Sequence, residues 1–245
     1  MTRALVPLAM SSISDLPEKC RSCVTWELPP AAAAGIDPGL AGFEKEVWLS
    51  GVMLTWGSAG QIVTVDDQPA GFALYAPPTA VPGASVFPTA PVSPDAVLLT
   101  TARILPEFRG QGLARYLMNG VVTALTSRGV RAIELFGLED GDAADDERSV
   151  GRRDSHDDVD LPKCLLPASF ARAVGFTDIQ SHRRYPRLRF ELSSGIGWKA
   201  EVESALEKLF NVITIPAPKV AQPALVKASI GSGRRRAAGP PPPER

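Results

Sequence analysis

The residues best suited to chemistry lie in one short stretch, residues 106–114, which reads Pro-Glu-Phe-Arg-Gly-Gln-Gly-Leu-Ala. The stretch follows an apolar, β-branched run at 96–105 and leads into a segment with Leu113, Leu117 and Val121 at helical spacing. These patterns predict a strand, a glycine-rich turn and a helix in succession. Such a turn presents unpaired backbone N–H groups and the positive end of the helix dipole to an anion. We therefore expect a phosphate group to bind here.

Three kinds of phosphate loop are built in this way, and the residues of the turn discriminate between them. Arg109 offers a donor fork suited to phosphate, and Gly110 and Gly112 lack the Cβ atoms that would keep a bulky anion away. A nucleotide-binding P-loop needs a lysine directly after its glycines, and none follows here. A dinucleotide fingerprint needs a third glycine where this chain has Arg115. The remaining kind is the pyrophosphate loop of an acyl-coenzyme A enzyme.

Two motifs carry a resemblance to a known family. Residues 109–114 resemble the Arg/Gln-x-x-Gly-x-Gly/Ala motif of the GNAT superfamily of acyl-CoA-dependent N-acyltransferases. Residues 170–176, Phe-Ala-Arg-Ala-Val-Gly-Phe, resemble the aromatic-Tyr-x-x-x-Gly-Phe signature that follows it in that superfamily, with Ala171 in place of the tyrosine. The two motifs occur in the family's order, and the resemblance covers residues 18–192.

The order of the predicted elements agrees with this resemblance. The patterns predict a helix at residues 42–56 and two strands around an Asp-Asp turn at 61–75. The strand and the helix that flank the phosphate turn are predicted at 96–105 and 113–125, and a further strand and a short helix at 129–136 and 170–174. The family's fold implies an α/β (α+β) domain with a central mixed sheet flanked by helices. Residues 20–27 and 185–189 further resemble an actinobacterial subgroup of the family, whose substrate the sequence does not identify.

Composition divides the chain into segments. We expect a flexible N-terminus at residues 1–17 and the acyltransferase domain at 18–192, with a mobile acidic insertion within it at 139–160. A C-terminal amphipathic helix is expected at 193–215, followed by a disordered basic tail rich in Pro, Ala and Gly at 216–245. The C-terminal helix is expected to pack on the domain, with a homodimer contact as the alternative. The proline-rich stretch 77–94 predicts a stiff loop, which either borders the acceptor side or is a plain surface loop.

The resemblance implies acetyl-CoA as co-substrate and an unidentified amine as acceptor. The pantetheine arm would pair with the backbone of the strand before the turn, and an N–H near Ala102 or Arg103 would hold the oxyanion while the amine attacks directly in a ternary complex. The implied cofactor-binding residues are Ala102, Ile104, Arg109, Gly110, Gln111, Gly112, Leu113 and Ala114. A non-catalytic acyl-CoA-binding regulatory module is the alternative, and Ala171 favours it because the family's usual proton donor is missing.

Glu134 is the predicted general base, because it lies on the strand after the phosphate helix, which borders the cleft in the family's fold. The alternative is an outward-facing polar residue of an alternating strand. Glu27, on a strand predicted at 24–28, and Tyr75 are weaker candidates on the acceptor side. With Ala171 at the tyrosine position, the sequence leaves the proton donor to the leaving thiolate open.

The three cysteines invite two sharper interpretations, and the sequence favours neither. A redox pair at Cys20-x-x-Cys23 would need to begin a helix after a strand, whereas the predicted strand follows it. A structural zinc site needs four ligands, and only Cys164, His156 and His182 could join the pair. We therefore expect half-buried packing thiols and no metal.

Length and charge bound the remaining function classes. The chain has 245 residues, 44% of them hydrophobic, and a formal net charge of −1, which argues against a generally basic nucleic-acid binder. No apolar run approaches the length of a membrane span. The first ten residues carry a proline where a signal peptide needs its apolar centre, and no convincing cleavage site follows. We expect a cytoplasmic enzyme without a membrane partner.

Overall fold

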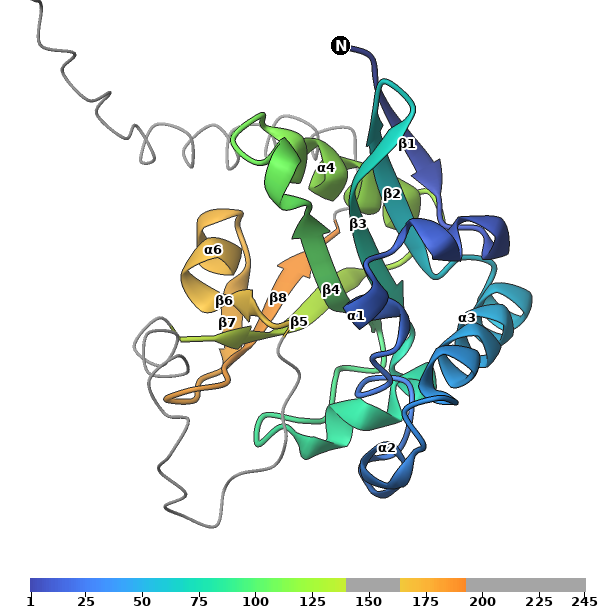
Figure 1. The fold of residues 1–245 in the computed structure, drawn as a ribbon. Coiled ribbons are helices and arrows are strands. Elements are labelled where there is room, and N and C mark those ends of the chain that lie inside the picture. Colours follow the sequence, from blue (N-terminus) through green and yellow to red (C-terminus); the bar gives the residue numbers. More distant parts are fainter. Residues whose placement is uncertain (140–163, 193–245) are drawn as a thin grey trace, which may run out of the picture. The chain divides into compact units, whose positions relative to one another are not determined.

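The computed structural model describes residues 1–139 and 164–192 (Figure 1). The chain divides into two units, Met1–Ile213 and Thr214–Arg245, and all described residues belong to the first. The expected acidic insertion beyond Glu139, the expected C-terminal helix and the expected basic tail lie outside the described residues.

A mixed sheet forms the centre of the first unit. Its strands follow the order β1-β2-β3-β4-β5-β8-β7, and β6 pairs with β5 beside this path. Neighbouring strands are antiparallel except β4 with β5 and β5 with β6, which are parallel. The strands are β1 Arg3–Pro7, β2 Gly60–Val65, β3 Gln68–Ala76, β4 Ala96–Ile104, β5 Ala132–Leu138, β6 Leu166–Pro167, β7 Thr177–Gln180 and β8 Arg187–Glu191.

Helices flank the sheet, as the sequence predicts. The α-helices are α1 Glu18–Arg21, α2 Pro30–Gly35, α3 Ala41–Trp56, α4 Leu113–Thr126 and α6 Ala168–Ala173. Short 3-10 helices are η1 Met10–Asp15, η2 Pro78–Ala80, η3 Pro82–Val86 and η4 Pro106–Phe108. The predicted helix–hairpin–strand–turn–helix–strand order is therefore confirmed.

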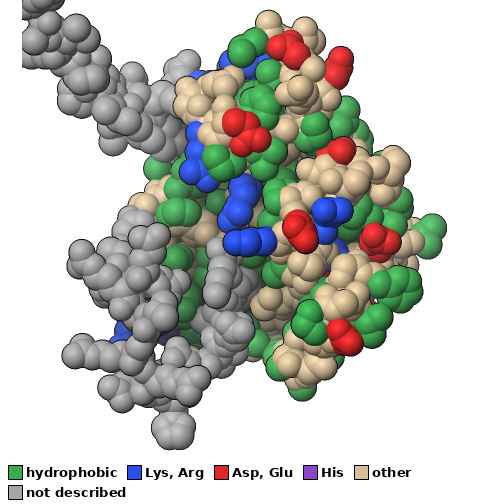
Figure 2. Space-filling view, in the orientation of Figure 1, with side chains coloured by type: hydrophobic (Ala, Val, Ile, Leu, Met, Phe, Trp, Pro, Cys, Tyr) green, Lys and Arg blue, Asp and Glu red, His purple; other side chains and the backbone are tan. Residues whose placement is uncertain are grey.

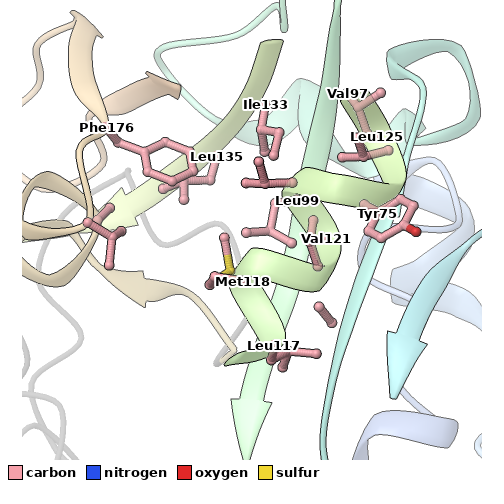
Figure 3. Close-up of a cluster of buried hydrophobic side chains, with 14 of the residues drawn as sticks. Tyr75, Val97, Leu99, Leu117, Met118, Val121, Leu125, Ile133, Leu135 and Phe176 are labelled. Carbon is pink, nitrogen blue, oxygen red and sulfur yellow. The ribbon is translucent and has the colours of Figure 1, made fainter. Parts of the chain in front are cut away.

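One core lies between the sheet and α4 (Figure 3). The apolar stripe of α4 buries Leu117, Val121 and Leu125 against side chains of β4 and β5 such as Leu99 and Ile133. Each such side chain contributes about 1.5–3 kcal/mol by leaving water. The stripe predicted from the 3.6-residue period is therefore what holds the N-terminus of α4 at the end of β4.

A second core covers the opposite face of the sheet. Leu49 and Val52 of α3 pack there with Leu74 of β3 and Leu98 of β4. Trp26, which precedes α2, is buried in the same cluster. The two faces are thus closed by different helices, α4 with α6 on one side and α3 with α1 on the other.

The structure corrects two expectations near the N-terminus. Residues 3–7, expected to be flexible, form β1, which pairs antiparallel with β2 along its whole length. The strand predicted at 24–28 is wrong, because these residues form a turn in which the N–H groups of Glu27 and Leu28 both donate to the carbonyl of Val24. The β-propensity of Val-Thr-Trp is overridden by tertiary packing, which buries Trp26 in the second core.

Candidate functional site

Strands β4 and β5 diverge at the centre of the sheet. Their pairing covers only Ala96 with Ala132, Val97 with Ile133 and Leu98 with Glu134. Figure 1 shows β4 continuing toward α4 while β5 runs toward α6. Within residues 1–139 and 164–192, the edge of β4 beyond Leu98 therefore has no strand partner on the β5 side. We call this gap in the ladder the β4–β5 opening.

The backbone groups of Ala102 and Ile104 face this opening. The N–H of Leu105 donates to the carbonyl of Ala70, 2.9 Å away, in continuation of the β3–β4 ladder. Because strand residues alternate their hydrogen-bonding direction, Arg103 also faces β3, and Ala102 and Ile104 face the other way. The register between β3 and β4 shifts next to Thr100, so a bulge lies close to the point where β4 leaves β5. The two residues predicted to pair with a pantetheine arm thus present their peptide groups to the side of β4 that has no strand partner among the described residues.

The phosphate turn, residues 109–114, lies at the far end of the same edge. Gly110 and Gly112 both adopt the left-handed region, with φ of 75° and 74°, and Gly112 is the N-cap of α4. No side chain caps this end of α4, and a Cβ built on either glycine would meet nothing within 4 Å among the described residues. The first N–H groups of α4 therefore face unfilled space, and an anion can approach the backbone closely.

Basic side chains gather on the same part of the surface. Figure 2 shows Lys and Arg side chains clustered where β4 ends and α4 begins in Figure 1. Arg103 and Arg109 are both exposed in this region. Their charge favours a phosphorylated ligand at the turn.

Glu134, the predicted base, is held in an ion-pair network. Its carboxylate is fully buried and accepts hydrogen bonds from Arg187 Nη1 at 2.6 Å, Arg189 Nη1 at 3.0 Å and the backbone N–H of Ser93 at 3.1 Å. Burial alone would raise the pKa of this carboxyl group, but the hydrogen bonds from Ser93, Arg187 and Arg189 outweigh it and hold the pKa below its usual value. A carboxylate stabilised in this way is a weaker base and has no lone pair turned to solvent. The alternative, an outward-facing polar residue, is wrong, because the side chain of Glu134 is fully buried. Its role as the general base stays a prediction.

The same network fixes the proline-rich loop 77–94. Arg187 donates to the carbonyl of Thr89 at 2.7 Å, and Thr89 Oγ1 donates to the carbonyl of Tyr185 at 2.9 Å. At the other end of the loop, Gly83 approaches the 24–28 turn so closely that a Cβ would lie 1.8 Å from the carbonyl oxygen of Thr25. The loop is therefore docked against the sheet and the turn, with its two 3-10 helices η2 and η3.

The two weaker acceptor-side candidates are structural residues. Glu27 has a fully buried side chain and forms an ion pair with Lys45 of α3, which is buried as well. Burial raises the pKa of Glu27, and Lys45 opposes that rise. Tyr75 is completely buried in the core beneath α4, where its hydroxyl lies 3.1 Å from Ser58 Oγ. Neither side chain is free to contact a substrate.

Ala171 lies on α6 and is fully buried in the core shared with α4. The short helix, the left-handed Gly175 with φ of 98° and strand β7 follow as the second motif predicts. The position at which the family has a tyrosine is therefore part of the packed core in this chain.

A group of sulfur contacts, which sequence analysis missed, lies across the β4–β5 opening. Cys164 comes two residues before β6, on the β5 side, and its sulfur accepts hydrogen bonds from Thr101 Oγ1 of β4 at 3.6 Å and from Trp26 Nε1 at 3.4 Å. No local sequence pattern points to these contacts, because Trp26 lies 138 residues before Cys164 in the chain.

An aromatic stack supports this cluster. The ring of Phe87 stacks on Phe136 at 4.2 Å and on Trp26 at 5.2 Å between centroids. The stack joins the proline-rich loop, β5 and the 24–28 turn, so Trp26 is held with its indole N–H aimed at Cys164.

The described part of the chain offers neither a metal site nor a helix that could span a membrane. In that part, no group of three or more His, Cys, Asp or Glu side chains is arranged to hold a metal ion. No helix of that part has the length and apolar character needed to cross a bilayer.

Comparisons with known proteins agree with the resemblance. The sequence model of the acetyltransferase (GNAT) family matches residues 39–146, which include α3, the β2–β3 hairpin, β4, the phosphate turn, α4 and β5. No curated protein matches the chain.

Several solved structures match most of this chain at low identity. The PaiA N-acetyltransferase from Thermoplasma acidophilum in complex with coenzyme A has 11% identity and a TM-score of 0.44, with 78% of this chain and 99% of that one covered. An N-acetyltransferase from Staphylococcus aureus Mu50 has 8% identity and a TM-score of 0.47, with 79% and 100% covered. The ribosomal-protein-S18-alanine N-acetyltransferase from Escherichia coli has 14% identity and a TM-score of 0.41, with 79% and 96% covered. Over residues 39–146, this chain is therefore similar in sequence to the GNAT family of acetyltransferases, and its two motifs and the order of its elements agree with that similarity.

Proposed function

We propose that this chain transfers an acetyl group from acetyl-CoA to an amine by direct attack in a ternary complex. The observation that carries the proposal is one continuous edge. Among the described residues, the β5-side edge of β4 has no strand partner from Leu99 onward, and that edge ends at the left-handed glycines before α4. An edge of this form suits a ligand with a peptide-like arm and a pyrophosphate at its end.

The residues of the phosphate turn would bind the pyrophosphate. The first N–H groups of α4 donate to its oxygens, and Gly110 and Gly112 leave room for it. Arg109 adds a charge-assisted contact, which contributes about 1.5–3 kcal/mol. Gln111, Leu113 and Ala114 contribute backbone groups of the same turn.

The open edge of β4 would position the thioester. The peptide groups of Ala102 and Ile104 pair with the amides of the pantetheine arm, as a neighbouring strand would. A backbone N–H on this edge then lies close to the thioester carbonyl and stabilises the oxyanion as the neutral amine attacks. The C–N bond forms, the C–S bond breaks, and the coenzyme leaves as a thiolate that takes up the proton released by the amine.

Proton transfer is the remaining step of the proposed reaction. Glu134 as the general base stays a prediction, and its buried ion pairs favour a structural role. Because positioning two reactants can lower the barrier by several kcal/mol, the reaction does not depend on one strong base. An exchange of protons with water is consistent with the exposed turn.

A non-catalytic acyl-CoA-binding module is the second candidate, because Ala171 stands where the family has a tyrosine and is buried. One experiment separates the two functions. Calorimetric titration measures CoA binding, and release of the CoA thiol from acetyl-CoA is followed with a panel of small amines, amino acids and peptides. Thiol release that needs an amine supports the transferase. Binding without release for every acceptor would favour the module, and absence of binding would contradict both.

A further inference from the structure

Arg103 leaves β4 on the face of the sheet opposite α4. It pairs with Phe72 across the β3–β4 ladder, and residues directly opposite each other in a ladder project to the same face. Phe72 lies in the second core, which α1 and α3 cover, whereas Ala102 and Ile104, on either side of Arg103, pack against the core beneath α4. The charge of Arg103 adds to the positive potential near the phosphate turn, but its side chain is directed to the side of β4 that we call the α1 face.

The α1 face of β4 becomes accessible to solvent beyond Thr101. Thr101 is 5% exposed, and its hydroxyl donates to the sulfur of Cys164 across the β4–β5 opening, at 3.6 Å. Arg103, two residues further along the same face, is exposed. On the other face, the core beneath α4 includes Leu99 and Leu135, one from each strand that borders the opening. An amine that attacks a thioester held on this edge therefore approaches it from the α1 face, past Arg103.

The guanidinium of Arg103 has no ion-pair partner among the described residues. Arg187 and Arg189, in contrast, are both held by the carboxylate of Glu134. A guanidinium fork that no carboxylate of the protein occupies is available to a carboxylate or phosphate of a ligand.

Arg21 of α1 is a second arginine on this face. Cys20, the residue before it, belongs to the same core cluster as Phe72, the cross-strand partner of Arg103. Arg21 is half-buried, and its Nε is a buried donor without a hydrogen-bond partner among the described residues. Such a donor destabilises the fold unless a ligand or water accepts its hydrogen bond. Burial raises the pKa of the Cys20 thiol and the charge of Arg103 opposes this rise, which agrees with a position of Arg103 close to α1.

We propose that Arg103 and Arg21 bind an anionic group of the acceptor, so that the amine acetylated by this chain carries a carboxylate or a phosphate. This inference rests on the proposed acyl transfer and adds the chemical class of its acceptor. The guanidinium fork fits either anion with two parallel hydrogen bonds. A cationic acceptor, such as a polyamine or a lysine-rich peptide, would be repelled by both arginines.

The pairing also suits the chemistry of the transfer. An anionic group raises the pKa of an amine in the same molecule, because it stabilises the ammonium form, and an arginine that neutralises this group removes the effect. The amine is then more readily neutral when it attacks the thioester carbon. No bond to the anionic group forms or breaks, so its only role is to hold the acceptor on the α1 face.

Matched pairs of acceptors test the charge preference of the parent. Glycine is compared with glycinamide, β-alanine with β-alaninamide, and O-phosphoethanolamine with ethanolamine, by following release of the CoA thiol at saturating acetyl-CoA. We expect kcat/KM for the anionic member to exceed that of its neutral partner at least about tenfold in at least one pair, the effect of one charge-assisted contact. Equal or higher values for the neutral member in all three pairs would overturn the proposal and leave the acyl transfer standing.

Variants test whether the two arginines cause the preference. Arg103→Gln should lower kcat/KM for the preferred anionic acceptor at least about tenfold, mainly through KM, and leave its neutral partner and the Kd for CoA within about twofold. Arg103→Glu should reverse the preference and favour 1,3-diaminopropane, and Arg21→Gln should shift the ratio of each pair in the same direction as Arg103→Gln. Arg3→Gln, which removes an exposed arginine of β1, is the control and should keep the parent's ratio. A parent-like ratio in Arg103→Gln, or a loss of CoA affinity as large as the loss for the acceptor, would contradict the assignment.

A binding measurement separates this proposal from the proposed acyl transfer. The members of each pair are titrated by calorimetry into the complex of the protein with CoA. Binding of an anionic amine that Arg103→Gln weakens at least about tenfold supports the anion site whether or not thiol is released. Absence of anion binding to the complex would overturn the anion site, whereas anion binding without thiol release from any acceptor would contradict only the acyl transfer.

Discussion

Gly112 shows how one missing side chain defines the candidate cofactor site. A leucine at this position would place its side chain in the unfilled space before α4 and would also strain a left-handed backbone, by about 1–2 kcal/mol. Gly129 has nearly the same φ, 73°, and equally open surroundings, but lies after α4, at the end away from the turn. Strain alone therefore affects both positions alike.

We expect Gly112→Leu to weaken CoA binding at least about tenfold, which corresponds to 1.4 kcal/mol or more. Gly129→Leu should lose similar thermal stability and bind CoA as the parent does. Arg109→Ala should weaken binding by about 1.5–3 kcal/mol, the worth of a charge-assisted contact. Calorimetric titration with CoA measures all three. Parent-like affinity of both Gly112→Leu and Arg109→Ala would refute the assignment of the turn.

Substitution of Glu134 tests whether this residue is a general base or a buried carboxylate that stabilises the fold. Glu134→Gln removes a buried charge that two arginines share, and breaking such a pair costs about 3–5 kcal/mol. Arg189 keeps Asp95 and Glu191 as partners, so we expect the lower end of that range. Denaturant unfolding at pH 7 measures the loss.

The rate profile of the same variant supplies the discriminating observation. As a structural residue, Glu134→Gln should leave the pH profile of thiol release unchanged in shape. A loss of rate confined to pH values below the pKa of the acceptor amine would instead establish Glu134 as the base, because only there must the amine lose a proton.

At the level of elements, substitutions in α6 test why Ala171 stands where the family has a tyrosine. They distinguish the loss of a catalytic side chain from a requirement for a small residue in the core. Ala171 is fully buried, so Ala171→Tyr must force a large ring into a filled core at a cost of about 1–3 kcal/mol. Ala173→Tyr, on the exposed side of the same helix, is the matched control and should stay within about 0.5 kcal/mol of the parent. Thermal unfolding compares the two. A stable Ala171→Tyr protein with faster thiol release would show that position 171 can reach the reacting sulfur.

Elements with a strong local signal could be predicted from the sequence. The stripe of α4 has a clear 3.6-residue period, and the Asp66-Asp67 turn fits a hairpin, since both residues adopt positive φ of 47° and 64°. The turn at 24–28 could not, because its residues favour a strand and only the docking of Trp26 decides otherwise. Strand β1 could not be predicted either, because it is only five residues long. The strand that stabilises it, β2, lies far along the chain.

The residues of the candidate site also divide into those with a local sequence signal and those whose contacts are distant in the chain. The glycines and Arg109 are contiguous, so their spacing alone predicts the turn. The two arginine partners of Glu134 come from β8, which pairs with β5 in the sheet but contributes residues 53 and 55 positions later in the chain. The hydrogen bond from Trp26 to Cys164 joins residues that are 138 positions apart. Such contacts follow from strand order and register, which local patterns do not specify.

For the molecule as a whole, the divergence of β4 and β5 has two consequences. It forms the candidate cofactor site, and it leaves little strand pairing between the two halves of the sheet. Among the described residues, the strand pairing between the β1–β4 half and the β5–β8 half consists of three residue pairs of β4 and β5. The core beneath α4 spans the two halves, and the network of Glu134 ties β5 and β8 to the loop that follows β3. This network should therefore matter for the stability of the whole fold.

Acid unfolding tests that role. The pKa values of Glu134, Asp95 and Asp178 are all lowered in the folded protein, chiefly by hydrogen bonds to arginines and, for Glu134, to Ser93. A carboxyl group with a lowered folded pKa stabilises the protein above its unfolded pKa, near 4, and this stabilisation is lost as the pH falls through the folded value.

We therefore expect the free energy of unfolding of the parent to fall steeply between about pH 5 and pH 3. Glu134→Gln should start lower at pH 7 but lose less over the same interval, because its share of the proton uptake is gone. Glu46→Gln, which removes a carboxylate from the exposed side of α3, should keep the parent's slope. Denaturant titrations at pH 7, 5, 4 and 3 measure these slopes. If Glu134→Gln and the parent lose stability in parallel, the pairing of Glu134 with Arg187 and Arg189 does not hold the two halves of the sheet together.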